Sequence, residues 1–187
     1  MLTRRSWILP ALAFTATSAV AFIATRSHIL HETPREVMTH IESRVRQAGG
    51  GANTCVHRRD PTPTVGRIRR PNPDILPTTM AYDVSQSAVR LTGVTTSPRY
   101  WSLSVFQHNS DNIFVLNDRD LRSPSFDVVI FAAGRQVQER EGAIMIESPS
   151  DTGIVLIRRF LPDEDEIEPI LANQNAMICD LLPYKLK

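Results

Sequence analysis

The sequence is poor in the residues that mark several common classes of protein. Its 187 residues include two cysteines and 6% aromatic residues, and 21 Lys and Arg against 20 Asp and Glu leave a net charge of +1. A near-neutral charge gives no electrostatic attraction to nucleic acid, and few aromatics give no platform for stacking bases, so we expect no nucleic-acid partner. The two cysteines do not form a C-x-x-C pair, which excludes zinc-ribbon and thioredoxin-type sites.

Motifs for catalysis and nucleotide binding are also missing. The chain has no G-x-S-x-G, no H-E-x-x-H, no P-loop and no G-x-G-x-x-G, and its 5 histidines are scattered. The sequence therefore predicts no catalytic residue, no cofactor and no metal ligand.

The N-terminus has a long apolar run behind a basic start. Arg4 and Arg5 precede the uncharged stretch Trp7–Thr25. Its length of about 19 residues, roughly 28 Å as a helix, approaches the ~30 Å hydrocarbon core of a bilayer. We therefore expect residues 1–32 to hold a single membrane anchor and its connector, with the bulk of the chain beyond the membrane. The large apolar side chains expected to face lipid are Trp7, Ile8, Leu9, Leu12, Phe14, Val20, Phe22 and Ile23.

A cleaved signal peptide is the alternative interpretation of the same segment. Ala19-Val20-Ala21 has the small-residue spacing of a cleavage site, and Trp7–Ala16 has the length of a signal core. The sequence leaves both alternatives open.

A second helix is predicted directly after the connector. Thr33 can cap it, Pro34 suits the first helical position, and Glu36 completes a capping box. Apolar residues then recur on one face until Gly49–Gly51 ends the periodicity. This predicts an amphipathic helix over residues 34–48.

The remainder of residues 33–187 predicts one mainly β domain with a short helix near its C-terminus. Prolines in residues 60–78 argue against a helix or a central strand there. Short apolar runs separated by turn residues then indicate an antiparallel β-sandwich or jelly-roll-like domain. The predicted strands are Thr79–Val84, Ala88–Val94, Arg99–Phe106, Asn112–Asn117, Phe126–Phe131, Ala143–Glu147 and Gly153–Phe160.

Several polar residues at strand ends make a candidate contact surface at the rim of the sheet. Arg158 and Arg159 point to opposite faces of their strand, so one of them must lie on or near the inner face. We expect that arginine to need a carboxylate partner, for which Asp74 and Asp118 are the candidates. The proposed surface comprises Asp74, His108, Asn112, Asn117, Asp118, Arg119 and Arg158.

The two cysteines, Cys55 and Cys179, can be explained in two ways. In an oxidising compartment they could form a disulfide that closes a long loop, but both lie among apolar residues where buried free thiols are common. The sequence does not decide between these alternatives.

An ordered set of short phrases carries a family resemblance. The phrases are Gly51–His57, Arg70–Asp74, Tyr82–Ser85, Tyr100–Phe106, Asn109–Val115, Asn117–Arg119, Ser148–Ser150 and Leu156–Arg159. Together they resemble the bacterial domain of unknown function 1254 family in its short, membrane-tethered form. The resemblance implies a β-sandwich on the outer, periplasmic side of the bacterial inner membrane. It also implies a companion chain of a related family, domain of unknown function 1214, and it transfers no catalytic residue.

Three functional hypotheses follow. The first is a membrane-anchored periplasmic accessory or assembly subunit that associates with another envelope or membrane protein. The second is an envelope enzyme, hydrolytic or otherwise, with a site drawn from Asp74, His108, Asp118 and Arg158. The third is a binding module for a small molecule or glycan, released after Ala21.

Overall fold

The computed structural model describes residues 7–59, 72, 74–95, 99–121, 123–161 and 163–185. The chain divides into two compact units, Met1–Val37 and Met38–Lys187. The mainly β fold predicted from the sequence is confirmed, with a long apolar helix before the β domain and a short helix near its end.

The first unit is dominated by the N-terminal part of helix α1 (Ile8–Gly49). This helix is long and apolar enough to cross a membrane. The hydroxyls of Thr15 and Thr17 bond back to the chain, as Thr17 Oγ1 does by donating to the Ala13 carbonyl over 2.9 Å, so these two polar groups need no water. The eight apolar residues predicted to face lipid are all exposed, by 54–75%. The apolar segment is therefore present as one helix that suits an anchor or a signal sequence.

Helix α1 does not begin again at Thr33-Pro34, so the separate helix predicted over residues 34–48 is wrong. Pro34 lies inside one continuous helix. Proline removes one backbone N–H donor, but the helical hydrogen bonds continue on either side of Pro34. The helix therefore passes through Pro34 instead of starting there. The predicted end is confirmed: Gly50 adopts φ 76° and the Gly51 amide donates to the Arg46 carbonyl, a Schellman end.

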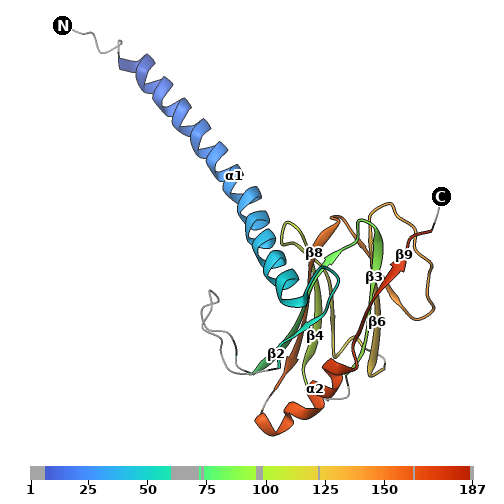
Figure 1. The fold of residues 1–187 in the computed structure, drawn as a ribbon. Coiled ribbons are helices and arrows are strands. Elements are labelled where there is room, and N and C mark those ends of the chain that lie inside the picture. The colour runs from blue at the N-terminus through green and yellow to red at the C-terminus, as the bar shows by residue number, and fades with distance from the viewer. Residues whose placement is uncertain are drawn as a thin grey trace. The chain divides into compact units, whose positions relative to one another are not determined.

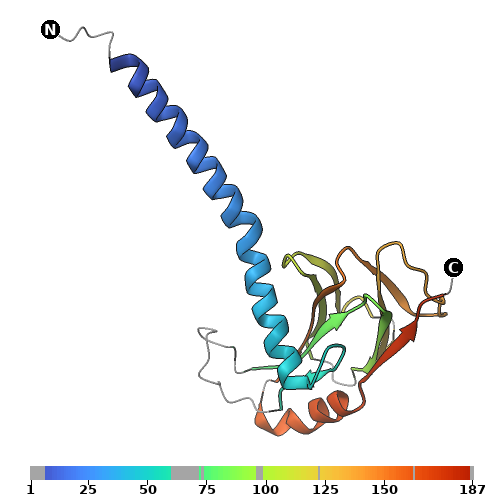
Figure 2. The ribbon, with the colours of Figure 1, turned by 45° about the horizontal axis from the view of Figure 1, so that its top comes forward.

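The second unit contains two packed sheets (Figures 1 and 2). In spatial order the first sheet contains β1 (Val56–His57), β2 (Ile75–Asp83), β8 (Thr152–Phe160), β4 (Trp101–Gln107) and β5 (Asn112–Asn117). The second contains β7 (Ile144–Ser148), β6 (Ser125–Ala132), β3 (Ser87–Val94) and β9 (Ile178–Pro183). All seven predicted strands are present with boundaries shifted by a few residues, and β1 and β9 were missed.

The second sheet is mixed, whereas the sequence predicted an antiparallel arrangement. Strand β7 runs parallel to β6, while every other pair is antiparallel. Parallel neighbours need a crossover, and the segment between β6 and β7 supplies it. Val137 in this segment packs with Ala88 and Val129 on the outer face of the sheet.

The core lies between the two sheets because their strands alternate apolar and polar residues. Tyr82, Leu103 and Ile157 from the first sheet meet Leu91 and Ile130 from the second, all of them fully buried. On the opposite face of the first sheet, a smaller cluster packs against residues 38–49 of α1. This alternation decides which polar residues of each strand face solvent and which face the core.

One end of the sandwich is covered by helix α2 (Ile167–Asn175), which follows the 3₁₀ turn η2 (Glu164–Glu166). Figures 1 and 2 both show α2 beside the ends of the strands. Ile170 packs there against Leu76 and Leu161. The short C-terminal helix predicted from the sequence is thus confirmed, and it closes the end of the core where the candidate site lies.

Strand β2 overturns the expectation that residues 60–78 hold no central strand. It begins at Ile75, contains Pro77, and lies between β1 and β8. The Pro77 carbonyl accepts from the Arg58 amide, so the missing N–H of Pro77 would have faced Arg58. The Arg58 carbonyl instead accepts a bond from Nε2 of the buried Gln174 over 3.1 Å. A side chain from α2 thus replaces the donor that proline lacks.

Candidate functional site

The seven residues predicted as a contact surface lie in separate places rather than at one rim. His108 and Asn112 flank the β4–β5 hairpin, at one end of the sheet. Asp74, Asn117, Asp118, Arg119 and Arg158 lie toward the opposite end, where the Asp118 amide donates to the Trp101 carbonyl and the Asp74 carbonyl accepts from Leu161. Several of these groups serve local turns, because the Asn112 and Asn117 side chains accept bonds from nearby backbone amides.

Arg158 belongs to a polar row on the outer face of the first sheet, in which Ser102 is only 4% exposed. It lies opposite Ser102 of β4, which in turn lies opposite Asn117 of β5. Ser102 accepts a hydrogen bond from the Tyr100 hydroxyl over 2.9 Å. Arg158 and Tyr100 are both exposed, so this row is a polar surface and not an enclosed site.

The residues proposed for an enzyme site do not converge. Three strand spacings of about 4.8 Å separate β2 from β5, which places Asp74 roughly 14 Å from Asp118. His108 lies six residues along β4 from Ser102, a further separation of about 20 Å. Groups this far apart cannot act on one reacting bond, so the enzymatic hypothesis loses the site on which it rested.

The inner-facing arginine of the pair is Arg159, which is only 3% exposed. Nη1 donates to Thr78 Oγ1 over 3.0 Å and Nη2 donates to Met177 Sδ over 2.9 Å. The predicted carboxylate partner is not found among the described residues: Asp118 is exposed on β5's side of the sheet, and Asp74 is exposed at the start of β2. A hydroxyl and a thioether hold the guanidinium in place of an anion.

Burial without an anion perturbs the titration of this region. It lowers the pKa of Arg159 from its ordinary value to about 10, because removal from water disfavours the charged form. The pKa of His57 is also lowered, first by its own burial and then by the charges of Arg159 and Arg59. His57 Nδ1 lies 2.9 Å from Thr78 Oγ1, so Thr78 joins the two groups.

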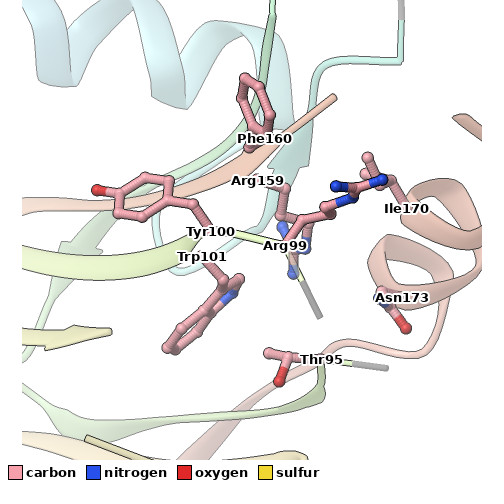
Figure 3. A pocket seen from close by; sticks show the side chains of 8 residues that line it. All are labelled: Thr95, Arg99, Tyr100, Trp101, Arg159, Phe160, Ile170 and Asn173. Atoms are coloured by element: carbon pink, nitrogen blue, oxygen red, sulfur yellow. The ribbon is translucent and has the colours of Figure 1, made fainter. Parts of the chain in front are cut away.

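A small pocket opens beside Arg159 at the α2 end of the sandwich (Figure 3). Its lining residues come from the ends of β3, β4 and β8 and from α2: Thr95, Arg99, Tyr100, Trp101, Arg159, Phe160, Ile170 and Asn173. The space that water-sized groups can enter measures about 10 Å³. Figure 3 shows the indole nitrogen of Trp101 on the side of its ring that faces Arg159.

Two buried donors in this lining have no acceptor. Trp101 Nε1 and Arg159 Nε are fully buried and make no hydrogen bond. The Trp101 ring is held by Phe126, whose ring centroid lies 5.0 Å away, so the indole is fixed by packing. Unpaired buried donors are rare in native proteins, and two in one pocket mark it as the candidate site.

The chain matches the family model described as "Protein of unknown function (DUF1254)" over residues 52–180. The chain belongs to the DUF1254 family. No curated protein matches it significantly. The matched residues include every residue of the Arg159 pocket, so the candidate site lies within the DUF1254 domain.

Two solved structures are similar to this DUF1254 chain. The crystal structure of the VPA0106 protein from Vibrio parahaemolyticus has a TM-score of 0.66 at 12% identity, covering 82% of this chain and 36% of that one. A crystal structure of an uncharacterized protein from Burkholderia cenocepacia has a TM-score of 0.45 at 15% identity, covering 87% and 41%. The first likeness shows the fold alone, and the chain spans well under half the length of either protein.

A second buried polar cluster joins α1 to the first sheet of the DUF1254 domain. Glu42 is 6% exposed, and its Oε1 lies 3.0 Å from His108 Nδ1 and 3.4 Å from Thr152 Oγ1. The His108 amide also donates to Ser150 Oγ. His108 thus fastens the helix to the hairpin, which is a structural role that the sequence did not indicate.

Cys55 and Cys179 form a disulfide, with their Cα atoms 6.3 Å apart. Cys55 lies directly before β1 and Cys179 lies in β9, so the bond joins the edges of the two sheets. The alternative of two free thiols does not apply in this structure.

Sequence reasoning identified the Arg158–Arg159 pair but missed the residues around it. Thr78, Trp101 and Met177 had only the signal of apolar or strand-forming positions, and their meeting depends on strand pairing across about 80–100 residues of sequence. Within the described residues, no group of three His, Cys, Asp or Glu side chains is placed to hold a metal ion.

Proposed function

We propose that this chain is a single-pass protein of the bacterial inner membrane whose periplasmic DUF1254 domain acts by binding another envelope protein. It would serve as an accessory or assembly subunit, and the partner would be a chain of the companion family, domain of unknown function 1214. The apolar part of α1 supports the tether by its length and composition. The disulfide supports an oxidising compartment, since such bonds persist outside the cytosol.

The observation that carries the association is the free edge at β9. This strand ends its sheet and pairs with β3 alone among the described strands. Leu181 lies opposite the core residue Val89 yet is 57% exposed, and Ile178 is 53% exposed. An unpaired edge with apolar side chains is the surface on which a partner strand adds, with backbone bonds for affinity and side-chain contacts for specificity.

Comparison with a larger protein supports a partner for this domain, without placing it at β9. The chain covers 36% of the VPA0106 protein, so in that protein this fold occurs beside further chain. In this protein, a separate chain could bind the domain in place of the additional chain that the larger protein contains.

Gentle detergent extraction of the tagged full-length chain from native membranes tests this proposal. We expect a larger species with one companion-family chain at fixed stoichiometry. Leu181→Lys should abolish it, because a charge would then face the partner's apolar side chains. Val115→Lys is the matched control, since Val115 is also an apolar, 50% exposed residue on an edge strand but on the other sheet.

Two results would contradict the proposal. Migration of the wild-type chain alone would remove the association, and an intact complex in Leu181→Lys would show that β9 is not the binding edge. A photo-crosslinker at Ile178 adds a direct measurement, because it should label the companion chain in higher yield than any other protein.

A further inference from the structure

We propose that the pocket around Arg159 binds the carboxylate group of a small organic acid. The proposal concerns a ligand of the DUF1254 domain itself and does not depend on the partner at β9. It rests on two unpaired, fully buried donors in one pocket, Trp101 Nε1 and Arg159 Nε, of which the second belongs to a buried cation.

The unpaired groups decide the polarity of the ligand. Arg159 has five N–H donors, of which one on Nη1 and one on Nη2 are used by Thr78 and Met177. Nε has no acceptor, and neither does Trp101 Nε1. Both groups can only donate, so the ligand must accept.

The charge of the site favours an anion over water. None of the eight lining residues in the part of the chain that the structure describes is acidic, and the acceptors of Arg159 there are a neutral hydroxyl and a neutral thioether. A water molecule could accept from both donors but would leave the buried charge uncompensated, whereas a carboxylate compensates the charge as well. A carboxylate oxygen has more than one lone pair, so a single oxygen can accept from both Arg159 Nε and Trp101 Nε1.

The size of the pocket places the ligand with its head inward. About 10 Å³ is room for roughly one water-sized group, so only one carboxylate oxygen enters and the rest of the acid remains at the mouth. Arg99 and Tyr100 lie at this mouth, where Tyr100 is 47% exposed. Arg99 is held there by Glu166, with Nη2 to Oε1 at 2.6 Å and Nε to Oε2 at 3.2 Å.

The Arg99–Glu166 pair gives the mouth a side chain that can move aside. Both side chains are well exposed, 47% and 38%, and exposed ion pairs contribute little to stability. Loss of the Glu166 charge removes one of the contacts of Arg99 at the mouth and leaves the two buried donors in place. Glu166→Gln should therefore leave acetate binding intact.

Acetate titration of the full-length protein in detergent at pH 7 tests the site. Sodium acetate replaces sodium chloride at constant sodium, and thermal unfolding is followed by differential scanning calorimetry, which also works for variants without Trp101. We expect the unfolding midpoint to rise with acetate along a single-site saturation curve. Trp101→Phe keeps an aromatic side chain at this position but removes the indole N–H, so it should weaken acetate binding by about tenfold or more.

Arg159→Met should abolish the acetate-dependent rise and, in acetate-free buffer, unfold at the same or a higher temperature than the wild type. Arg158→Met is the matched control, one residue away on the exposed face of β8, and it should retain the full response. Should Met at 159 prevent folding, Arg159→Lys keeps the charge without the guanidinium Nε donor and should weaken acetate binding by tenfold or more.

Three outcomes would overturn the proposal. They are a flat midpoint in the wild type, an equal acetate response in Arg159→Met, or a linear response without saturation. The first means no site at these concentrations, and the others mean a general salt effect.

Discussion

Removal of the Cys55–Cys179 disulfide should cost this domain a large part of its stability. The two cysteines are 124 residues apart in sequence and join the edge of one sheet to the edge of the other. Closing a loop of that length removes chain entropy from the unfolded state, which corresponds to about 5 kcal/mol at 25 °C. Native disulfides of small domains usually contribute about 2–5 kcal/mol, so the loop length places this one at the upper end.

The measurement is urea unfolding of the full-length chain in detergent, followed by the fluorescence of the buried Trp101. With a denaturant slope of about 2 kcal/mol per molar, a loss of about 2–5 kcal/mol lowers the midpoint by about 1–2.5 M. Cys55→Ser with Cys179→Ser should show this shift, and dithiothreitol should give the same shift in the wild type. Reductant added to the double variant is the control and should change nothing.

The reasoning fails if the wild type, the reduced wild type and the double variant all unfold at one midpoint. The edges of the sandwich would then be held by packing alone. A second measurement tests the compartment: thiols trapped by acid in intact cells should resist maleimide labelling until they are reduced. Full labelling without reductant would contradict the proposed location outside the cytosol.

Three further predictions concern other residues of the domain. Gly153→Ala should destabilise the domain by about 2–3 kcal/mol in urea unfolding, because a Cβ there would overlap the backbone carbonyl oxygen of Phe106 and the hydroxyl of the fully buried Tyr82; an unchanged midpoint would refute this. The pKa of His57 is lowered in the folded state, so its contribution to stability is present above pH 6.5 and is lost as the pH falls through the lower folded value. Stability measured from pH 7 to 5 should therefore fall less steeply in His57→Gln, and parallel curves would contradict it. Glu42→Ala should cost about 1–2 kcal/mol through the loss of its bond to His108, and a double-mutant cycle with His108→Ala should give a non-zero coupling.

Local sequence patterns predicted most of the strands. They failed for strands that form only because a neighbouring strand pairs with them. Strand β5 was predicted with the same ends, Asn112–Asn117, because its apolar residues stand between two polar turns. Strand β1 has two residues, and β9 carries Pro183, so neither has a recognisable strand period. Both exist because a long neighbouring strand, β2 or β3, pairs with them.

Proline positions show the same limit. Pro77 argued against a central strand, yet a side chain of α2, Gln174, supplies the donor that proline lacks. Pro34 argued for a helix start, yet the helix continues through it. Each signal was correct about the local cost of proline and silent about what the rest of the chain does to offset that cost.

The candidate site could be predicted only in part for a related reason. Alternation along β8 indicates that one of Arg158 and Arg159 faces inward, but the parity of the strand is fixed by its neighbours and not by the two residues. The expectation of a carboxylate beside the inner arginine came from the rule that buried charges are usually paired with an opposite charge. The structure has Thr78 and Met177 there, from positions 81 and 18 residues away in sequence, and no rule of local sequence connects them.

The contrast between the two arginines of β8 is what separates a structural charge from a binding group. Arg158 is exposed and keeps its hydration, so the fold bears no cost for it. Arg159 is buried and has a hydroxyl and a thioether as acceptors in place of water. Burial lowers its pKa to about 10, because these weak acceptors do not compensate for the loss of hydration. Elsewhere in the domain a partly buried cation does have its anion, as Arg90 has both oxygens of Asp127. The fold pairs Arg90 with an anion of its own but leaves Arg159 beside an unpaired indole N–H. On the proposal above, the acceptor for the Arg159 charge is a ligand from outside the chain.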